Sequence, residues 1–261
     1  GKRISKAWAT EQHFYFTIQF SQAAEKSTFR KNKAGKPSKL ILEFGHVNPV
    51  LTVKVGISAV DIDGAKQNLK KEMPEWDIAK YRQECQTLWD NELHKIEAHV
   101  NSDYIKTTFY TALYHSYLNP NTFSDVDGRY RGMDMKIHKA KTHTQYTVFS
   151  LWDTFRGTHP LFTITQQERT SDFIKTFLSQ YKEGGILPIW ELSGNYTGCM
   201  IGYHSIPVIV DAYVKGIRDF DAELALKAML HSAEQSHLGL EAYIKQGLSL
   251  IHISEPTRQE A

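Results

Sequence analysis

The spacing of the hydrophobic residues changes once along this chain, and the change limits which folds are open to it. Hydrophobic and polar side chains alternate strictly in residues 13–20 and again in residues 51–57. Alternation with a period of two is typical of half-buried β-strands that have one solvated face. From Asp63 onward, hydrophobic residues instead recur at helical spacing. The pattern predicts an α+β chain with antiparallel strands first and helices after them.

A charged segment separates the two alternating runs. Residues 30–37 read R-K-N-K-A-G-K-P, with glycine and proline as turn signals. We interpret this basic run as a solvated hairpin loop and not as a binding patch. The strands resemble the last strands of a β-sandwich whose beginning is absent, and we place a domain boundary near residue 62.

The second part of the chain predicts a succession of helices. They cover residues 63–99, 103–117, 173–181 and 206–216, and another opens at Asp221. Pro74 should break the first helix, while Pro120 and Gly184-Gly185 should end the next two. A β-hairpin between residues 129 and 143 is the one expected exception. Helices with functional-looking residues in their loops would suit an α/α barrel, and a plain helical bundle is the alternative.

Composition excludes several classes of protein. There are 31 basic and 29 acidic residues, so no basic surface for nucleic acid is predicted. The spacing of Cys85 and Cys199 matches no metal or redox motif, and we expect two free or buried thiols. No run is long enough to span a membrane. Because the chain begins with Gly1, we expect an internal piece, and the lack of a signal peptide carries no information about location.

The segment Tyr146–His159 is densest in aromatic and ionisable groups. It contains Trp152, Asp153 and Arg156, and on a helix the last two would lie on one face and could pair. A carboxylate and a guanidinium can orient sugar hydroxyls while an indole covers the C–H face of the sugar. The alternative interpretation is a buried structural ion pair beside a core tryptophan.

A second segment, residues 184–203, repeats this arrangement. Trp190 precedes Glu191 there, as Trp152 precedes Asp153. Two such units suit a sugar site, and an inverting glycosidase needs two carboxyl groups roughly 6.5–9.5 Å apart. On spacing alone, Asp153 and Glu191 are candidates for that pair.

Other motifs are weaker. A D-x-D-G run begins at Asp125, but Arg129 and Lys136 occupy positions where an EF-hand needs ligands. His204 and Asp211 could share a helical face, yet no third zinc ligand lies nearby, so a core histidine is favoured. No G-x-S-x-G motif, P-loop or dinucleotide-binding fingerprint occurs.

Five longer motifs resemble one enzyme family. They are Y-T-A-L-Y-H-S-Y-L-N-P-N (110–121), F-S-D-V-D-G-R-Y-R-G-M-D (123–134), Y-T-V-F-S-L-W-D-T-F-R (146–156), G-G-I-L-P-I-W-E-L (184–192) and C-M-I-G-Y-H-S-I-P-V-I-V-D-A-Y-V-K-G (199–216). In this order they resemble glycoside hydrolase family 92, the calcium-dependent exo-acting α-mannosidases. The resemblance covers most of residues 1–247.

The resemblance implies a multidomain α+β architecture. Residues 1–62 would form the C-terminal part of an N-terminal β-sandwich, residues 63–99 a helical linker, and residues 100–247 the first part of an (α/α)6 catalytic barrel. The implied activity is exo-acting hydrolysis, with inversion, of terminal α-linked mannose from N-glycans or mannan. The partner would be a mannose-containing oligosaccharide, and the location would be periplasmic, on the outer surface or secreted. A non-catalytic mannose-binding or structural helical module, or another inverting (α/α)6 glycosidase, are the alternatives.

The resemblance also assigns roles to residues. Asp153 matches the aspartate of W-D-T-F-R and would bind hydroxyls of the terminal mannose. Trp152, Arg156, Trp190 and Glu191 would lie in or around that pocket. In the family, calcium helps to distort the bound mannose.

The general acid, the base and the calcium ligands of the family lie in later motifs that this chain lacks, of the types E-G-N-x-W-Q-Y, N-E-P-S and D-x-G-Q-M-S. We therefore expect Ca²⁺ and the catalytic groups only in an intact parent, and we interpret Asp153 and Glu191 as substrate-binding. Residues 248–261, L-S-L-I-H-I-S-E-P-T-R-Q-E-A, fit no family motif and resemble translated adapter sequence, so we expect a non-native tail.

Overall fold

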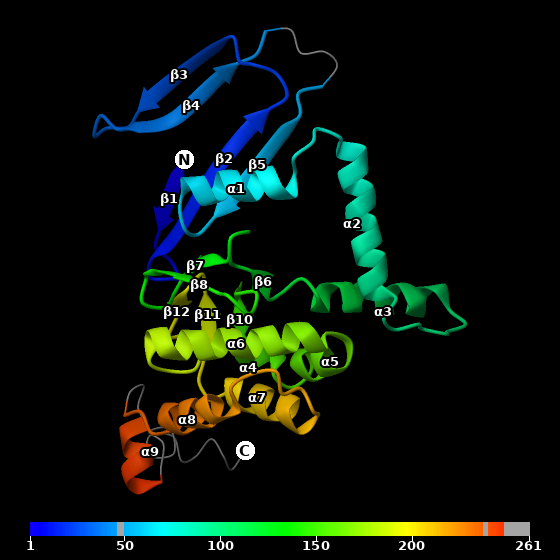
Figure 1. Cartoon of the computed structure of the whole chain (residues 1–261), viewed down its shortest axis with the longest axis vertical. Coiled ribbons are helices and arrows are strands. Elements are labelled where there is room, and N and C mark those ends of the chain that lie inside the picture. Colours follow the sequence, from blue (N-terminus) through cyan, green and yellow to red (C-terminus); the bar gives the residue numbers. More distant parts are fainter. Residues whose placement is uncertain (46–49, 237–239, 248–261) are drawn as a thin grey trace, which may run out of the picture. The chain divides into compact units, whose positions relative to one another are not determined.

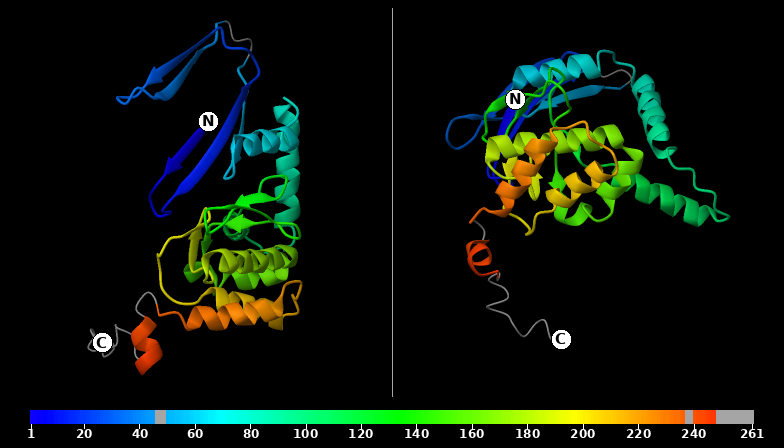
Figure 2. Two further views of the ribbon diagram at one scale, coloured as in Figure 1. Left: turned by 60° about the vertical axis from the view of Figure 1, so that its left-hand side comes forward. Right: turned by 60° about the horizontal axis from the view of Figure 1, so that its bottom comes forward.

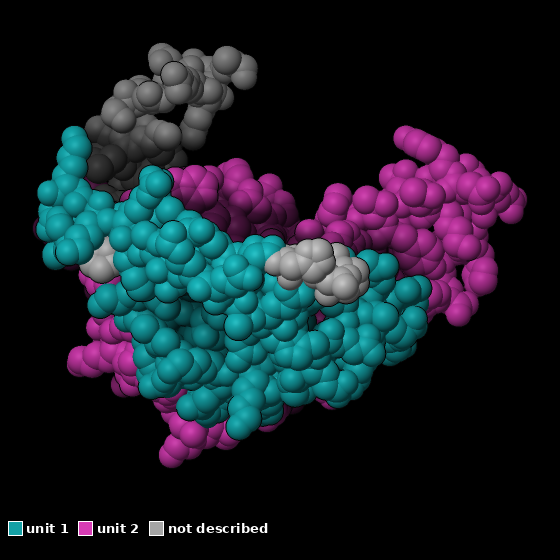
Figure 3. Space-filling view, turned by 90° about the horizontal axis from the view of Figure 1, so that it is seen from above, with its two compact units in different colours: residues 1–3, 13–92, 125–127 teal, residues 4–12, 93–124, 128–261 magenta. Residues whose placement is uncertain are grey.

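The structure is a computed structural model of the chain, and it describes residues 1–45, 50–236 and 240–247. The chain divides into two compact units (Figure 3). Unit 1 comprises residues 1–3, 13–92 and 125–127, and unit 2 comprises residues 4–12, 93–124 and 128 onward. The expected tail at 248–261 lies outside the described residues.

Strands dominate the first part of the chain. They are β1 (Lys2–Ser5), β2 (Gln12–Phe20), β3 (Lys26–Lys31), β4 (Pro37–Glu43) and β5 (Val53–Ser58). One sheet has the order β1-β2-β5, and β3 pairs with β4 in a hairpin. The strands predicted at 13–20 and 51–57 are confirmed as β2 and β5, and the hairpin predicted at 30–37 is confirmed as the β3–β4 turn. The hairpin turn is stabilised by Asn32, whose side-chain oxygen accepts hydrogen bonds from the N–H groups of Ala34 and Lys36, both at 3.0 Å.

The buried face of β5 is not the one that its alternating pattern predicts. Its polar side is the buried one: Lys54, Gly56 and Ser58 lie beneath helix α1 (Ile62–Glu72). A Cβ atom on Gly56 would lie 2.3 Å from the carbonyl oxygen of Ala65, so this close approach requires glycine. The apolar side, with Val55 51% exposed, is uncovered within the described residues. The strand assignment is therefore right, whereas the buried face is the opposite one.

The helical region that follows divides into two helices, as Pro74 predicts. Helix α1 begins after Asp61, whose carboxylate accepts a 2.6 Å hydrogen bond from the N–H of Gly64. Helix α2 (Ile78–Leu93) has no buried residue. Leu88 is 66% exposed, whereas its neighbour Trp89 is half-buried.

Asp125, which opens the D-x-D-G run, has a structural role in unit 1. Its carboxylate is buried and accepts hydrogen bonds from the Ser58 hydroxyl at 2.8 Å and from the Asn68 side-chain amide at 2.7 Å. A Cβ atom on Gly64 would lie 2.2 Å from the same carboxylate. Because protein donors surround this group, it holds α1 and β5 together and does not form a calcium loop.

Unit 2 is mostly helical. Its helices are α3 (Asp103–Ser116), α4 (Leu151–Thr154), α5 (Thr158–Thr165), α6 (Gln167–Gly184), α7 (Ser205–Val214), α8 (Ala222–Ala233) and α9 (Leu240–Gln246). Short strands lie between them: β6 (Asn121–Thr122), β7 (Arg129–Arg131), β8 (Ile137–Lys139), β9 (Tyr146–Thr147), β10 (Phe149–Ser150), β11 (Trp190–Leu192) and β12 (Asn195–Tyr196). Strands β7 and β8 form the hairpin predicted at 129–143. The other strands were not predicted, because two or three residues are too few for a periodic pattern.

Helices α5, α6, α7 and α8 pack against one another and enclose the core of unit 2 (Figures 1 and 2). Phe149, Phe173 and Phe177 are almost completely buried, and their rings meet edge to face. Full burial of such a side chain stabilises the fold by about 1.5–3 kcal/mol. The face of α6 predicted from Phe173, Phe177 and Leu178 is therefore confirmed.

Local signals end and begin these helices where the sequence predicts. Gly185 follows α6 in the left-handed conformation, with φ = 84°, which a glycine adopts without a steric penalty. Asp221 caps α8 by accepting a 2.9 Å hydrogen bond from the N–H of Leu224. Among the described residues, no helix combines the length and apolar character needed to cross a membrane.

Candidate functional site

A small sheet brings the two tryptophan–carboxylate segments together. Strand β10 pairs with β11, which in turn pairs with β12, and all three are antiparallel. In this register Ser150 lies opposite Trp190, and Phe149 lies opposite Glu191. The N–H of Leu151 continues the pairing by donating to the carbonyl oxygen of Ile189 at 3.2 Å. Residues 146–159 and 184–203 therefore contribute to one surface of unit 2.

Helix α4 presents the first pair of candidate residues. It is one turn long and starts directly after β10, so Trp152 and Asp153 leave the sheet toward solvent and both are exposed. Leu151, by contrast, points into the core and is completely buried. The hydroxyl of Ser150 donates a hydrogen bond to the carboxylate of Asp153, which orients that carboxylate.

Arg156 does not make the predicted ion pair. Helix α4 ends at Thr154, so Arg156 is not placed one helical turn above Asp153, and no ion pair joins the two among the described residues. The guanidinium carbon instead lies 5.5 Å from the ring centroid of Trp152 and 4.9 Å from that of Phe155. These are cation–π distances. The site thus has a guanidinium over two aromatic rings next to an exposed carboxylate.

His204 belongs to the same group of side chains. Its ring centroid lies 4.4 Å from that of Phe155. Burial of the ring and the positive charge of Arg156 lower the pKa of His204, which favours the neutral imidazole. Asp211, the other member of the candidate pair with His204, forms an ion pair with Lys215 at 2.7 Å instead.

Glu191 differs from Asp153 in its surroundings. It is completely buried, and its carboxylate accepts hydrogen bonds from the hydroxyl of Thr147 at 2.9 Å and from the N–H of Gly194 at 2.6 Å. Burial raises the pKa of Glu191 to about 7, although these hydrogen bonds favour the charged form. The carboxylate therefore faces protein donors in the interior.

Those donors shape the turn between β11 and β12. Ser193 and Gly194 both have positive φ, 52° and 74°. The N–H of Ser193 donates to the Thr147 hydroxyl at 2.7 Å, and the N–H of Gly194 donates to Glu191. A left-handed serine costs of order 1 kcal/mol, and the buried carboxylate and hydroxyl hold it in place. Glu191 thereby positions the strand that carries its neighbour, Trp190.

A third tryptophan lies beside this site, and the sequence pattern did not predict it. Trp8 is 65% exposed, and its ring meets that of Trp190 edge to face, with the centroids 5.6 Å apart. The residues that follow Trp8 are attached to the β11–β12 turn. Both the Thr10 hydroxyl and the Glu11 N–H donate to the side-chain oxygen of Asn195 at 3.0 Å. Trp8 belongs to no periodic segment, so the sequence contained no signal for this contact.

These groups can bind a polar ligand that has an apolar face. The Asp153 carboxylate can accept hydrogen bonds from hydroxyl groups, and the Arg156 guanidinium can donate them. The rings of Trp152 and Trp190 offer flat apolar surfaces beside these charges. Pyranose sugars combine hydroxyl groups with apolar C–H faces, so the arrangement suits a carbohydrate.

The described residues do not supply a metal site. No group of three or more His, Cys, Asp or Glu side chains within the described ranges could hold a metal ion. Calcium takes six to eight oxygen ligands, and the carboxylate of Glu191 is already enclosed by protein donors. These residues by themselves therefore do not fit a calcium ion.

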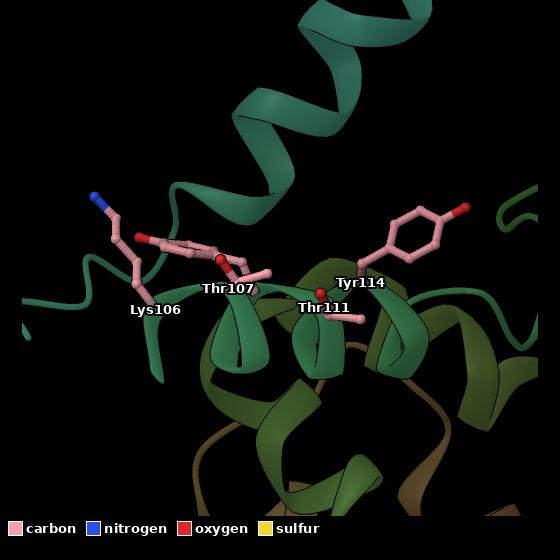
Figure 4. A pocket seen from close by; sticks show the side chains of 5 residues that line it. Lys106, Thr107, Thr111 and Tyr114 are labelled. Atoms are coloured by element: carbon pink, nitrogen blue, oxygen red, sulfur yellow. The ribbon is translucent and has the colours of Figure 1, made fainter. Parts of the chain in front are cut away.

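A separate hollow lies along α3 and includes none of the candidate residues (Figure 4). Lys106, Thr107, Tyr110, Thr111 and Tyr114 line it. The hydroxyl of Tyr110 already bonds with the Ala98 N–H and the Ile96 carbonyl, both at 3.2 Å. Its lining comes from one helix, whereas binding pockets usually collect convergent polar groups from several elements.

Comparison with known proteins identifies the family. Residues 64–258 match the family model described as the glycosyl hydrolase family 92 catalytic domain. This match covers more than half of the chain and includes every candidate residue except Trp8. The class is therefore that of the glycoside hydrolases, and the chain belongs to glycosyl hydrolase family 92.

Solved structures agree with this assignment. The chain is similar to an alpha-mannosidase of this family from Bacteroides thetaiotaomicron, with 38% identity and a TM-score of 0.86, over 93% of this chain and 35% of that one. The same alpha-mannosidase is also known in complex with mannoimidazole. An inverting mannosidase of the family from Bacteroides thetaiotaomicron VPI-5482 is 28% identical with a TM-score of 0.84, over 95% of this chain and 36% of that one. The mixed α+β arrangement is thus that of family 92 structures.

A curated relative is named an uncharacterized secreted glycosidase of Arthroderma benhamiae. It is 28% identical over 189 residues, which are 70% of this chain and 20% of the relative. The chain thus spans about a third of the length of the solved relatives and a fifth of the curated one.

Proposed function

We propose that this chain forms part of an exo-acting α-mannosidase that removes terminal α-linked mannose from N-glycans or mannan. The observation that carries the proposal is the 38% identity, at a TM-score of 0.86, to an alpha-mannosidase of the same family. Inversion at the anomeric carbon is proposed because another relative is an inverting mannosidase. The mannoimidazole complex of the first relative supports a mannose-like ligand.

The exposed side chains of α4 would bind the terminal mannose. Asp153 would accept hydrogen bonds from two of its hydroxyls, because an ionised carboxylate forms strong and geometrically selective bonds. Trp152 and Trp190 would cover C–H surfaces of the sugar, and Arg156 would donate to a further hydroxyl. The Ser150–Asp153 hydrogen bond supports this role, since it fixes the carboxylate before the sugar arrives.

Glu191 would contribute to the same pocket from beneath it. Because its carboxylate is enclosed, its part in substrate binding would be to hold Trp190 and the turn at residues 193–194 in place. A contact between Glu191 and the sugar itself would require the turn to open.

The catalytic acid, the catalytic base and the calcium ligands would lie outside this chain. This part of the proposal rests on the length of the relatives, of which the chain spans about a third. When bound, calcium would supply charge stabilisation and help to distort the sugar ring. The residues of α4 and β11 would bind and orient the sugar.

We propose the corresponding domain arrangement for the parent protein. Residues 1–62 would complete a β-sandwich, residues 63–99 would form a helical linker, and residues 100–247 would begin an (α/α)6 barrel. The uncovered apolar side of β5 supports the sandwich, because a hydrophobic sheet face is normally packed against another layer. A periplasmic, outer-surface or secreted location is proposed from the curated relative, which is named a secreted glycosidase.

The substitution Asp153→Asn in the full-length parent tests the sugar site. Loss of a charged hydrogen-bond acceptor should lower kcat/KM on α-mannosides by about 10- to 100-fold. The melting temperature should stay within a few degrees, because Asp153 is exposed. Initial rates and thermal denaturation of the purified variant check both expectations.

Asp219→Asn is a matched control, because Asp219 is an exposed carboxylate paired with Lys175 at 2.7 Å and lies outside the site. Its kcat/KM should equal that of the unaltered parent. Unchanged activity of the Asp153 variant would refute the proposed pocket. A collapse of its thermal stability would instead favour the structural role of Asp153.

A further inference from the structure

Trp8 is a large apolar side chain that packing alone does not explain. It is 65% exposed, whereas the next residue, Ala9, is buried. The segment is held by Ala9 and by the hydrogen bonds of Thr10 and Glu11 with Asn195. The indole of Trp8 is therefore not needed to attach the segment, and an exposed indole next to a second one is an unusual surface feature.

The contacts of Trp8 connect it to the sugar site through Trp190. Its ring meets Trp190 edge to face, with a 75° angle between the planes and 5.6 Å between the centroids. Trp190 lies opposite Ser150 across the β10–β11 pair, and Ser150 donates to Asp153. Trp8 is thus linked to Asp153 through Trp190 and Ser150. It extends the aromatic surface of Trp190 beyond the residues that are proposed to bind the terminal mannose.

Several hydrogen bonds join the segment that carries Trp8 to the turn that follows Trp190. The side-chain amide of Asn195 is buried and donates to the Glu11 carbonyl at 3.2 Å and to the Ser193 carbonyl at 3.0 Å. A further hydrogen bond of 3.3 Å runs from the Gln12 side-chain amide to the Ser193 hydroxyl. The turn that is shaped by Glu191 therefore also holds the segment that carries Trp8.

We propose that Trp8 is a specificity-determining residue that binds the second sugar unit of the substrate, on the leaving-group side of the bond to be cleaved. This inference rests on the proposed function. An exo-acting glycosidase must hold two units, the terminal sugar and the unit to which it is attached. Two indoles at a steep angle form an apolar corner, and the C–H face of a pyranose can pack against the exposed ring.

The test compares substrates that differ only beyond the scissile bond. In the full-length parent, kcat/KM is measured for α-linked mannobiose and for α-mannosyl fluoride, whose leaving group is too small to reach Trp8. Trp8→Ala should lower the ratio of kcat/KM for mannobiose to kcat/KM for mannosyl fluoride by about 10- to 100-fold, as truncation of an aromatic anchor at a binding site does. Trp8→Phe should restore most of the ratio, because a flat ring remains.

Trp76→Ala is the matched control, since Trp76 is also a partly exposed tryptophan (42%) but lies in unit 1 against Lys54. It should leave the ratio unchanged. An unchanged ratio in the Trp8→Ala variant would overturn the inference. An equal loss on both substrates would also overturn it, because Trp8 would then act on the fold and not on the second sugar.

A binding experiment separates this inference from the proposed function. If the unaltered parent hydrolyses neither substrate, the proposed activity fails. Titration with sulfur-linked α-mannobiose and with methyl α-mannoside then decides the role of Trp8. If Trp8→Ala weakens the binding of the disaccharide but not that of methyl α-mannoside, the second-sugar site is supported. If the unaltered protein does not bind the disaccharide, the site is refuted.

Discussion

Two carboxylates that each follow a tryptophan have opposite surroundings in this protein. Asp153 is exposed on a one-turn helix, and a single hydroxyl orients it. Glu191 is enclosed on a strand, where burial raises its pKa to about 7. The exposed carboxylate is therefore suited to bind hydroxyl groups of a ligand, and the enclosed one is suited to hold a turn.

The raised pKa of Glu191 predicts a pH dependence of local stability. The ordinary pKa of a glutamate side chain is 4.5, and this value applies to the unfolded state. Between pH 4.5 and about 7, the folded state therefore binds more protons than the unfolded state does. Stability must then fall as pH rises through this window. A Glu191→Gln variant stays neutral and should lack this loss. The equilibrium constant for local opening of the unaltered protein, divided by that of the variant, should therefore rise by about one to two orders of magnitude between pH 5 and pH 8.

Hydrogen exchange of residues 190–196 in the full-length parent measures this effect. The ratio of exchange rates between the unaltered protein and the variant is compared at each pH, because the intrinsic pH dependence cancels in the ratio. A ratio that stays constant from pH 5 to pH 8 would show that Glu191 does not titrate in this range.

At the scale of elements, helix α1 covers one side of the sheet of unit 1, and the described residues leave the other side exposed. In the β2–β5 pair, Ile18 lies opposite Val55, and Phe16 lies opposite Ile57. This apolar side carries some of the most exposed hydrophobic residues of the sheet, with Ile57 at 53%. A face of this kind is expected to be packed in a complete sandwich domain.

Cysteine labelling tests whether the parent covers this face. In a background without Cys85 and Cys199, Val55→Cys should react with a maleimide much more slowly in the full-length protein than Thr28→Cys does. Thr28 lies on the exposed hairpin strand β3 and serves as the matched position. Equal rates at the two positions would show that the apolar side of β5 faces solvent in the parent too.

At the scale of the whole molecule, the described residues of unit 2 also leave apolar surface uncovered. A groove of about 380 Å³ lies between α7 and α8, lined mainly by Ile209, Tyr213, Phe220, Leu226 and Met229. Uncovered apolar surface costs roughly 25 cal/mol per Å², while total domain stability is only about 5–15 kcal/mol. The chain by itself should therefore be poorly soluble or partly unfolded.

Residues 1–261 expressed alone should bind a hydrophobic dye, self-associate and release no mannose from α-mannosides. The full-length parent is the control, and it should be dye-silent and active. Dye fluorescence, sedimentation and a mannose assay with and without a chelator measure these properties. Chelator-sensitive mannose release by the purified chain would overturn the proposal that the acid and base lie outside it, and would return Asp153 and Glu191 as the candidate pair.

Local sequence determined the elements of this protein. Alternation predicted β2 and β5, Pro74 predicted the break between α1 and α2, and Asp221 predicted the start of α8. These signals work because they act within a few residues, through backbone geometry and short-range hydrogen bonds. The family motifs likewise determined the membership that the family model bears out.

Tertiary structure decided which side chains meet and which are buried. The similar pairs Trp152-Asp153 and Trp190-Glu191 have different surroundings because one lies on a helix that leaves the sheet and the other on its central strand. Trp8 meets Trp190 because Thr10 and Glu11, which follow it, donate hydrogen bonds to Asn195, 185 and 184 positions further along the chain. Burial and long-range contact arise from the packing of distant segments, and no local pattern encodes them.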